Sequence, residues 1–343
     1  MTLNLGGNSL VARACAALLA IAFATGLAAG PSRADNSFGP YGPEGPRLRE
    51  QFWLLPSGDP KAFLRATVFR PVDASPADAA LRRPVVIINH GTSESTRLAV
   101  AMPVYYWLSR WFVERGYVVV LPQRRGHGAT GGPLVEGTDT CANPDHFRSG
   151  LAAADDIGAV VSYMAGQPFV DPSEIVVTGI STGGWASLAL ASRNPAVRAV
   201  INIAGGRGGH AWGRPNEICG EQRLIQAARD YGATARIPTL WLYARNDSYF
   251  GPNLATSMAK VWRGGGGLVE LSVLPAYGVE GHDISDDRAG WDVWGPAVVR
   301  FLAANQLPIE PHHERPAREE ISSVATVATS AGTGPAEPAG GRD

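Results

Sequence analysis

Short runs of apolar residues alternate with longer segments of mixed polarity along most of the chain. The short runs are rich in Val, Ile and Leu, which is typical of strands buried on both faces. The longer segments carry apolar residues at the spacing of one helix face. This alternation predicts the α/β class, with a mostly parallel sheet covered by helices on both sides. The predicted strands are 64–69, 85–89, 118–121, 175–180, 197–203, 239–243 and 268–274, and the predicted helices are 103–115, 147–164, 185–191, 222–231, 254–261 and 291–302.

The alternating pattern does not extend to the ends of the chain. Residues 35–60 are rich in Pro and Gly and predict an extended arm ahead of a domain over 61–305. Residues 306–343 are dominated by Pro, Ala, Glu, Ser and Gly, which predicts a disordered tail. With 343 residues in all, the chain is long enough for one large domain with a substantial core.

The first 34 residues have the pattern of a secretory signal peptide. Arg13 precedes an apolar run over 14–29, and small residues up to Ala34 precede Asp35. We therefore expect cleavage after Ala34 and an exported protein, periplasmic or secreted. An uncleaved membrane anchor is the alternative, but the run is short and rich in alanine for a span. The exported chain would carry 28 basic and 31 acidic residues, and its net charge of −3 gives no reason to expect a nucleic-acid partner.

A Gly-x-Ser-x-Gly sequence joins one predicted strand to the helix that follows it. Gly179-Ile180-Ser181-Thr182-Gly183 comes directly after a β-branched run and leads into the apolar segment 185–191. A strand, a tight turn and a helix are the setting in which a serine becomes a nucleophile, because the turn exposes its hydroxyl above the sheet edge. The N–H groups at the start of the helix can then bind a developing oxyanion. Ser181 is the predicted nucleophile.

A serine hydroxyl is a weak nucleophile at neutral pH unless a histidine takes its proton. The chain has seven histidines, and the position of His282 is the most informative. It follows the strand 268–274 through a Gly-rich loop and precedes the helix 291–302. A side chain in such a loop lies at the sheet edge where the serine is exposed. His282 is therefore the predicted base, and a loop histidine that only bonds to backbone is the alternative.

Asp247 is the predicted acid that orients this histidine. It follows the strand 239–243 and lies after Ser181 and before His282, which is the chain order Ser, Asp, His. An aspartate there could instead form a turn or cap the next helix. Three aspartates after the histidine compete for the role, and we interpret them as a solvated cap cluster ahead of the last helix: Asp283, Asp286 and Asp287.

The oxyanion hole requires a second N–H group from the loop after an earlier central strand. The strand 85–89 is followed by His90, Gly91 and Thr92. Gly91 permits close approach of the backbone, so the Thr92 N–H is the predicted donor, together with the Thr182 N–H. His90 is expected to fix the loop.

These residues resemble the α/β-hydrolase superfamily, and within it the dienelactone hydrolase-like group and the serine aminopeptidase-like, lysophospholipase-type group. The resemblance covers roughly residues 50 to 305 and rests on His90-Gly91 after a strand, the sequence 179–183, Asp247 and His282. The sequence Arg125-Gly126-His127-Gly128-Ala129-Thr130-Gly131-Gly132 is similar to a loop of the second group. The resemblance implies the α/β-hydrolase fold, nucleophilic hydrolysis and a short cap insertion at about 205–220.

Two positions depart from these groups. Dienelactone hydrolases carry a cysteine nucleophile where this chain has Ser181, which argues against that narrow activity. The aspartate that commonly lies two residues before the Arg-Gly-His-Gly sequence is Gln123 here. The second departure weakens a finer family assignment but does not touch the predicted triad.

Cys141 and Cys219 are the two cysteines that remain once the first 34 residues are removed. In an oxidising compartment an isolated pair often forms a disulfide. Both cysteines lie in segments expected above the catalytic edge, so a bridge would clamp the roof of the pocket; two buried free thiols are the alternative. Trp212 in the insertion and Tyr249 after the predicted acid are candidate pocket residues, although either could pack within the domain instead.

The leading hypothesis is an exported serine hydrolase that cleaves carboxylic esters through an acyl-enzyme, without a metal or an organic cofactor. An exported serine peptidase or amidase with the same triad is the nearest alternative. Esters are favoured because the chain shows no propeller-like domain and no obvious acidic pair to bind a peptide amino terminus. A catalytically silent α/β-hydrolase that serves as a binding module is the third possibility. The expected partner is a small ester or short peptide, with no nucleic acid and no stable membrane anchor after signal cleavage; the oligomeric state stays open.

Overall fold

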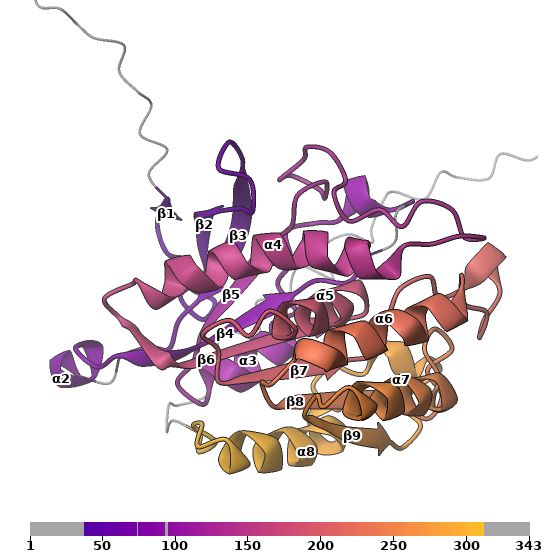
Figure 1. Ribbon diagram of the computed structural model, residues 1–343. Helices are drawn as coiled ribbons and strands as arrows, with labels where there is room; N and C mark the ends of the chain where they lie inside the picture. Colours follow the sequence, from indigo (N-terminus) through magenta and orange to yellow (C-terminus); the bar gives the residue numbers. More distant parts are fainter. Residues whose placement is uncertain (1–37, 74, 93–94, 312–343) are drawn as a thin grey trace, which may run out of the picture. The chain divides into compact units, whose positions relative to one another are not determined.

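A nine-stranded sheet organises the residues that the computed structural model describes, which are 38–73, 75–92 and 95–311. Its strand order is β1-β2-β3-β5-β4-β6-β7-β8-β9. The first three strands and their junction with β5 are antiparallel, whereas the later pairings are parallel. The strands are β1 (Gly39–Tyr41), β2 (Gln51–Pro56), β3 (Phe63–Phe69), β4 (Arg83–Asn89), β5 (Val118–Gln123), β6 (Val170–Ile180), β7 (Ala199–Ile203), β8 (Thr239–Ala244) and β9 (Val269–Leu274) (Figure 1).

The central parallel strands are buried along their whole length. Every residue of β4, β5, β7 and β8 is buried, which fits their runs of valine, isoleucine and leucine. Because parallel strands all point the same way, their carboxyl ends share one edge of the sheet. The loops after β4, β6, β8 and β9 therefore meet at that edge, and these loops carry the predicted site residues.

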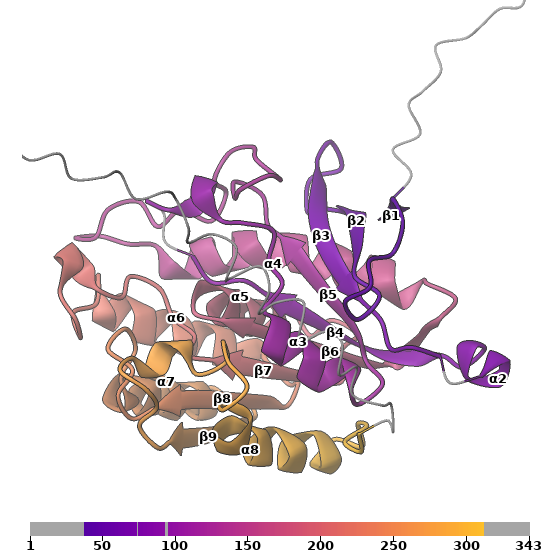
Figure 2. The ribbon, with the colours of Figure 1, turned by 180° about the vertical axis from the view of Figure 1, so that it is seen from behind.

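Helices cover both faces of the sheet. α4, α5, α6 and α7 pack on one face, where Trp185, Tyr231 and Trp262 are buried (Figure 1). α3 and α8 pack on the other face (Figure 2). There the ring centroids of Trp111 and Trp294 lie 5.2 Å apart. This arrangement confirms the predicted fold class. The helices are α2 (Pro76–Ala79), α3 (Tyr106–Val113), α4 (His146–Ala165), α5 (Thr182–Ala191), α6 (Glu221–Thr234), α7 (Pro252–Gly264) and α8 (Trp291–Ala304), with the 3-10 turns η1 (Arg97–Ala99), η2 (Ala211–Gly213) and η3 (Gly281–Asp283).

The segment 35–60 differs from the extended arm that its composition predicts. It contains β1 and β2, which pair antiparallel with each other, and β2 pairs with β3 to enlarge the sheet. Residues alternate along β2, with Gln51, Trp53 and Leu55 buried and the residues between them half-buried. This period of two is short and is flanked by Pro and Gly, so the composition of the segment hid the strand.

Some predictions fall outside the described residues. The signal peptide and its cleavage site precede residue 38, and almost all of the predicted tail follows residue 311. Within the described ranges, no helix is both long enough and apolar enough to span a membrane. The export of the protein and the domain limits 61–305 therefore stay predictions.

Asp156 on α4 holds together segments that are distant in the chain. Its carboxylate accepts the N–H groups of Gly58 and Arg125 at 3.0 Å each, and the Arg125 Nε–H at 2.7 Å. The Asp156 side chain is fully buried, so these donors replace the water that would otherwise solvate it. They fix the turn between β2 and β3 and the loop after β5 against α4.

Asp156→Ala should lower the free energy of unfolding by about 3 kcal/mol, because Arg125 and two N–H groups lose their acceptor in the interior. Asp155→Ala is the matched control. Asp155 pairs with Arg193 at 2.6 Å on the surface, where loss of an ion pair costs less than about 1 kcal/mol. Denaturant unfolding followed by circular dichroism measures both variants, and equal losses would contradict the role assigned to Asp156.

Candidate active site

Ser181 lies at the turn between β6 and α5 in a backbone conformation that L-residues rarely adopt. Its φ and ψ are +55° and −123°. The Ser181 N–H donates to the Ile203 carbonyl at 3.0 Å, and the Ser181 carbonyl accepts the Gly206 N–H at 3.2 Å. Gly183 has to be glycine, because a Cβ there would lie 2.1 Å from the carbonyl oxygen of Asn89. The tight turn presents the serine hydroxyl at the carboxyl edge of the sheet, beside the N-terminus of α5.

His282 and Asp247 form a hydrogen-bonded pair across the loops after β9 and β8. The imidazole Nδ1 lies 3.2 Å from Asp247 Oδ1 and 3.1 Å from Oδ2. Asp247 is buried, and its Oδ1 also accepts the N–H groups of Tyr249 and Phe250 at 2.8 and 2.9 Å. Asp247 therefore orders the turn that follows it and also contacts the histidine. When Nδ1–H donates to the carboxylate, Nε2 keeps a lone pair that can accept a proton.

Ser181 and His282 line the same pocket, which has a volume of about 620 Å³. Among the described residues, however, the hydrogen bonds of His282 do not include one from the Ser181 hydroxyl. Hydrogen bonds between nucleophile and base often tighten only when a substrate binds. The structure thus brings the three predicted triad residues to one site without closing the contact between nucleophile and base.

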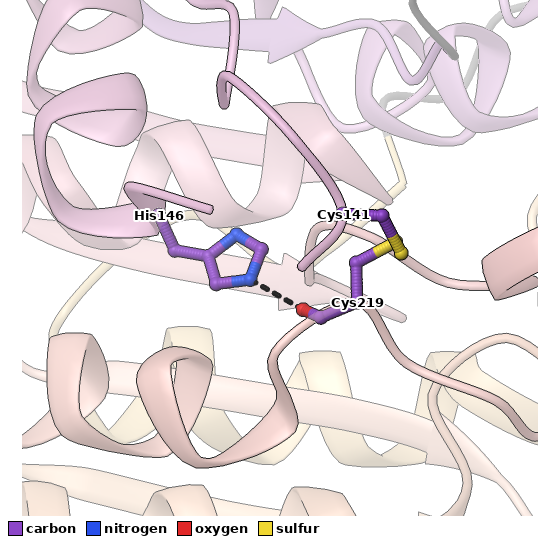
Figure 3. The surroundings of a disulfide bond; sticks show 3 residues. All are labelled: Cys141, His146 and Cys219. Atoms are coloured by element: carbon purple, nitrogen blue, oxygen red, sulfur yellow. Dashed lines mark hydrogen bonds between the residues drawn. A yellow bond between two sulfur atoms is a disulfide. The ribbon is translucent and has the colours of Figure 1, made fainter. Parts of the chain in front are cut away.

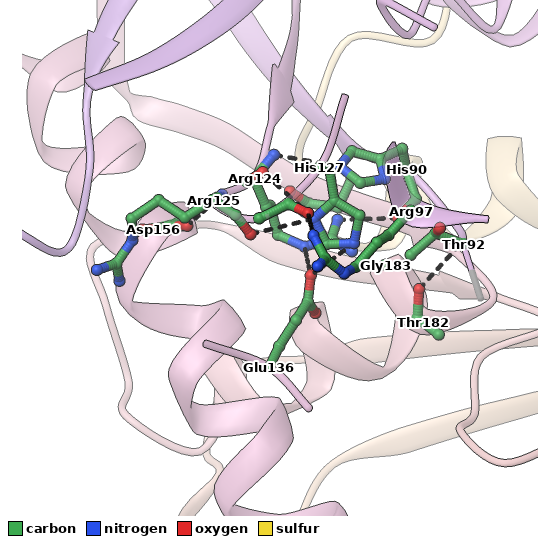
Figure 4. Close-up of polar contacts among 12 residues, drawn as sticks. His90, Thr92, Arg97, Arg124, Arg125, His127, Glu136, Asp156, Thr182 and Gly183 are labelled. Atoms are coloured by element: carbon green, nitrogen blue, oxygen red, sulfur yellow. Dashed lines mark hydrogen bonds and ion pairs between the residues drawn. The ribbon is translucent and has the colours of Figure 1, made fainter. Parts of the chain in front are cut away.

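The two predicted oxyanion donors have different surroundings. Thr182 is the first residue of α5, so its N–H has no carbonyl one turn earlier in the helix to bond. The Thr92 N–H donates to the Thr182 hydroxyl at 3.1 Å (Figure 4). Gly91 passes so close to the turn that a Cβ on it would lie 2.9 Å from Ser181 Cβ. The loop after β4 therefore reaches the nucleophile, but its Thr92 N–H is directed at a side chain of α5.

Tyr105 is a pocket residue that no sequence pattern revealed. It precedes α3 with a φ of +35°, and its hydroxyl oxygen accepts the Gly91 N–H at 3.0 Å. Burial, with a smaller contribution from the nearby Asp286 carboxylate, raises the pKa of Tyr105 to about 12. The phenol therefore keeps its proton at neutral pH and can donate it to a group in the pocket.

A buried set of charged and polar side chains supports the loops after β4 and β5. Arg124 Nε donates to Glu136 at 3.0 Å, and Arg207 bonds to the other oxygen of that carboxylate. The Arg124 N–H also donates to His90 Nε2 at 3.1 Å, and its guanidinium donates to the His90 carbonyl at 2.8 Å (Figure 4). Burial and the Arg124 charge hold the pKa of His90 well below its usual value. His90 is thus a neutral acceptor, which fits the expectation that it fixes the loop.

Gln123, which departs from the family pattern, organises the Gly-rich loop that follows it. Its Oε1 accepts the Thr130 N–H at 2.8 Å, and its Nε2 donates to the Val100 carbonyl at 3.0 Å. Arg97 donates to the Gly126 carbonyl of the same loop at 2.7 Å. A glutamine can serve both as donor and as acceptor, which an ionised aspartate could not do. Gln123 therefore ties the loop both to itself and to the segment before α3.

Three carboxylates line the pocket, those of Asp139, Asp283 and Asp286. The three aspartates after the histidine are exposed, as expected of a solvated cluster, but only Asp287 bonds to the Gly290 N–H ahead of α8, at 3.0 Å. Desolvation in the pocket wall and the neighbouring Asp283 carboxylate raise the pKa of Asp286 to about 6. The lining also includes Arg207, whose guanidinium is bonded to Glu136, so three carboxylates and one paired cation share the pocket with the nucleophile.

Of the two candidate pocket residues, the structure brings only Tyr249 to the pocket. The Tyr249 ring stacks on that of His282, with centroids 4.4 Å apart. Trp212 is not in the lining, and 67% of its surface is exposed. Its φ of +54° belongs to an irregular turn in the insertion, and the Arg214 guanidinium lies 5.4 Å from its ring centroid. The interpretation of Trp212 as a pocket residue is therefore not supported.

A disulfide joins Cys141 to Cys219, which confirms the predicted pairing. Both cysteines line the pocket, and the bridge ties the loop before α4 to the insertion before α6. His146 Nε2 donates to the Cys219 carbonyl at 2.8 Å (Figure 3). Burial lowers the pKa of His146 to about 4, so the ring is neutral at pH 7 and this bond uses its one N–H. The bridge is thus part of the pocket wall.

The serine turn at the carboxyl edge of a mostly parallel sheet is that of a serine hydrolase with the α/β-hydrolase fold. Comparison with protein families makes the assignment more specific. Residues 61–248, more than half of the chain, match the model of the X-Pro dipeptidyl-peptidase (S15) family, and the chain belongs to that family. No curated protein matches the chain.

Several solved structures share the fold at low sequence identity. Dipeptidyl peptidase 4 from Porphyromonas gingivalis matches with a TM-score of 0.55 and 16% identity, over 75% of this chain and 35% of that one. A puromycin-hydrolyzing peptidase of Mycobacterium tuberculosis matches with a TM-score of 0.56 and 16% identity, over 79% and 42%. Acetyl xylan esterase 1 from Thermoanaerobacterium sp. JW/SL YS485 matches with a TM-score of 0.51 and 16% identity, over 78% and 87%. The chain thus spans less than half the length of these two peptidases.

Replacing both Cys141 and Cys219 by serine should lower the free energy of unfolding by about 2–4 kcal/mol, because the bridge closes a long loop in the unfolded chain. The two cysteines are 78 positions apart. Denaturant unfolding with and without reductant measures the effect. The reduced wild type should match the double variant, and a wild-type midpoint that reductant leaves unchanged would contradict the prediction.

Proposed function

We propose that this serine hydrolase cleaves acyl bonds in substrates that carry a protonated amino group, short peptides above all, through an acyl-enzyme on Ser181. The observation that carries the proposal is the composition of one cavity. Ser181 and His282 line it together with the carboxylates of Asp283 and Asp286. Membership of the X-Pro dipeptidyl-peptidase family and the likeness to a puromycin-hydrolyzing peptidase support the peptide class.

The reaction follows from the positions of the three triad residues. Ser181 Oγ attacks the carbonyl carbon while its proton passes to His282 Nε2, and Asp247 stabilises the imidazolium that forms. Collapse of the tetrahedral intermediate breaks the bond to the leaving group, which takes the proton from His282. A water molecule then attacks the acyl-enzyme and gives a proton to His282. Collapse of this second tetrahedral intermediate breaks the bond to Ser181 Oγ, which takes the proton back from His282 as the acid is released.

The oxyanion would bind at the N-terminus of α5. The Thr182 N–H is one donor, since α5 offers it no partner. The Tyr105 hydroxyl is a second, because its oxygen accepts from Gly91 and its proton is left to donate. The Thr92 N–H joins them if a substrate oxygen replaces the Thr182 hydroxyl as its acceptor.

The carboxylates of Asp283 and Asp286, which we call the acidic wall, support recognition of a cationic group. An ammonium bonded to a carboxylate forms a charge-assisted hydrogen bond, which is stronger than a neutral one. Sequence alone favoured esters because no propeller-like domain and no acidic pair were apparent; the lining by Asp283 and Asp286 supports the peptide class instead.

Neutral carboxylic esters are the second candidate. Ile180, Tyr249 and Phe250 line the same pocket and offer apolar contacts to an acyl chain that carries no charge. The same nucleophile and base would act, because an ester needs no different machinery.

We also propose that the protein works in an oxidising compartment after export. The disulfide between Cys141 and Cys219 supports this, since such bonds persist mainly outside the cytosol. The predicted cleavage after Ala34 would release it there.

Paired substrates test the substrate class. Alanyl p-nitroanilide and alanyl p-nitrophenyl ester should be cleaved with a higher kcat/KM than their N-acetylated counterparts. The double variant Asp283→Asn with Asp286→Asn should lose about tenfold in kcat/KM on the free amines only, since each exposed ion pair contributes up to about 1 kcal/mol.

As the pH falls through about 6, protonation of Asp286 removes its negative charge, so the preference for the free amine should decline. The ratio of the two substrates cancels titration of groups common to both.

Two further variants serve as controls. Asp292→Asn removes the same charge on an exposed side chain of α8 and should leave the ratio unchanged. Ser181→Ala should abolish turnover of every substrate. Faster cleavage of the N-acetylated esters would support the second candidate instead. Substrate binding without turnover in the wild type would point to a binding module.

A further inference from the structure

Glu280 connects the loop that carries the acid to the loop that carries the base. Its Oε1 accepts the His282 N–H at 3.0 Å and the Ser248 N–H at 3.1 Å. Its Oε2 accepts the Ser248 hydroxyl. Since Ser248 directly follows Asp247, one carboxylate spans the loops after β8 and β9 where the acid and the base have to meet.

The same network continues into the insertion between β7 and α6. His210 Nε2 lies 2.8 Å from the Ser248 hydroxyl oxygen. Because the Ser248 proton is donated to Glu280, the oxygen is left as an acceptor and His210 Nε2–H is the donor. The His210 ring stacks on the Tyr249 ring, with centroids 3.5 Å apart and an angle of 12° between planes, and Tyr249 stacks on His282. The base is therefore held by its backbone through Glu280 and by its ring through Tyr249.

The charge of Glu280 suits this place. Burial raises its pKa, but the hydrogen bonds from Ser248 and from the His282 N–H, together with the nearby imidazole, outweigh burial and lower the pKa below its usual value.

We propose that Glu280 is a positioning residue for His282, which holds the base in line with Asp247 and connects it through Ser248 to His210 of the insertion. The inference rests on the proposed function, because it takes His282 as the base. Glu280 is not in the lining of the 620 Å³ pocket, so its removal should act on kcat and leave KM nearly unchanged.

Two substitutions separate the charge of Glu280 from its role as an acceptor. Glu280→Ala removes both, and we expect kcat to fall about ten- to hundredfold because N–H groups of two loops lose their acceptor. Glu280→Gln keeps an acceptor oxygen and should lose less than about tenfold. In both variants KM should stay close to its wild-type value, because the groups that line the pocket are unchanged.

Control variants guard against a general effect on folding or charge. Glu270→Gln, on an exposed position of β9, removes the same charge outside the network and should keep wild-type kinetics. Ser248→Ala removes the hydroxyl that connects Glu280 to His210, and its kcat should lie between those of the wild type and Glu280→Ala. Thermal unfolding midpoints check that each variant folds. A wild-type kcat in a folded Glu280→Ala would overturn the proposal, as would equal losses of kcat in Glu270→Gln and Glu280→Gln.

A spectroscopic measurement tests Glu280 without any substrate. The proton between His282 Nδ1 and Asp247 should give a downfield resonance in the ¹H NMR spectrum. In Glu280→Ala we expect this resonance to broaden, because a less constrained imidazole exchanges its proton with water faster. If the wild type cleaves none of the amino substrates, the proposed function fails while the resonance still decides on Glu280. An unchanged resonance in Glu280→Ala would overturn the positioning role alone.

Discussion

Ser181 keeps an unfavourable backbone conformation because both its N–H and its carbonyl are hydrogen-bonded to neighbouring segments. Its N–H is bonded to the end of β7, its carbonyl accepts from Gly206, and β4 fills the space beside Gly183. A non-glycine residue in such a region costs on the order of 1–3 kcal/mol, so the turn depends on the packed parallel sheet around it. The strain places the hydroxyl at the sheet edge, next to the helix N-terminus and facing the pocket.

The rest of the site consists of loops at the carboxyl edge of the sheet that surround Ser181. Each loop is tied down by bonds outside the triad: Arg124 fixes the loop after β4, the disulfide joins the two segments of the roof, and Glu280 joins the loops of acid and base. Loops carry the chemistry because only they extend past the strand ends, and they need such ties because the sheet itself holds only their first residues. The pocket carboxylates of Asp283 and Asp286 belong to the same construction, since both follow the base within four residues of the chain.

The sheet, the serine turn and the disulfide partners were predictable because each has a local signal. Buried parallel strands need continuous β-branched runs, the turn needs glycines at fixed offsets, and two cysteines leave one pairing. Side-chain directions in loops have no such signal. Asp286 is exposed as expected, but nothing indicated that it lines the pocket; Trp212 looked like a pocket residue, and nothing distinguished Tyr105. Their orientations depend on backbone turns with positive φ at Tyr105 and Trp212, and on which loops face each other across the sheet edge.

The central claim is that Ser181 is the activated nucleophile of this site. The most direct measurement is covalent labelling with a fluorophosphonate, followed by intact mass and peptide mapping. The account predicts a single adduct on the peptide that contains Ser181, with no adduct in Ser181→Ala. An adduct on another residue, or equal labelling of Ser181→Ala, would contradict it.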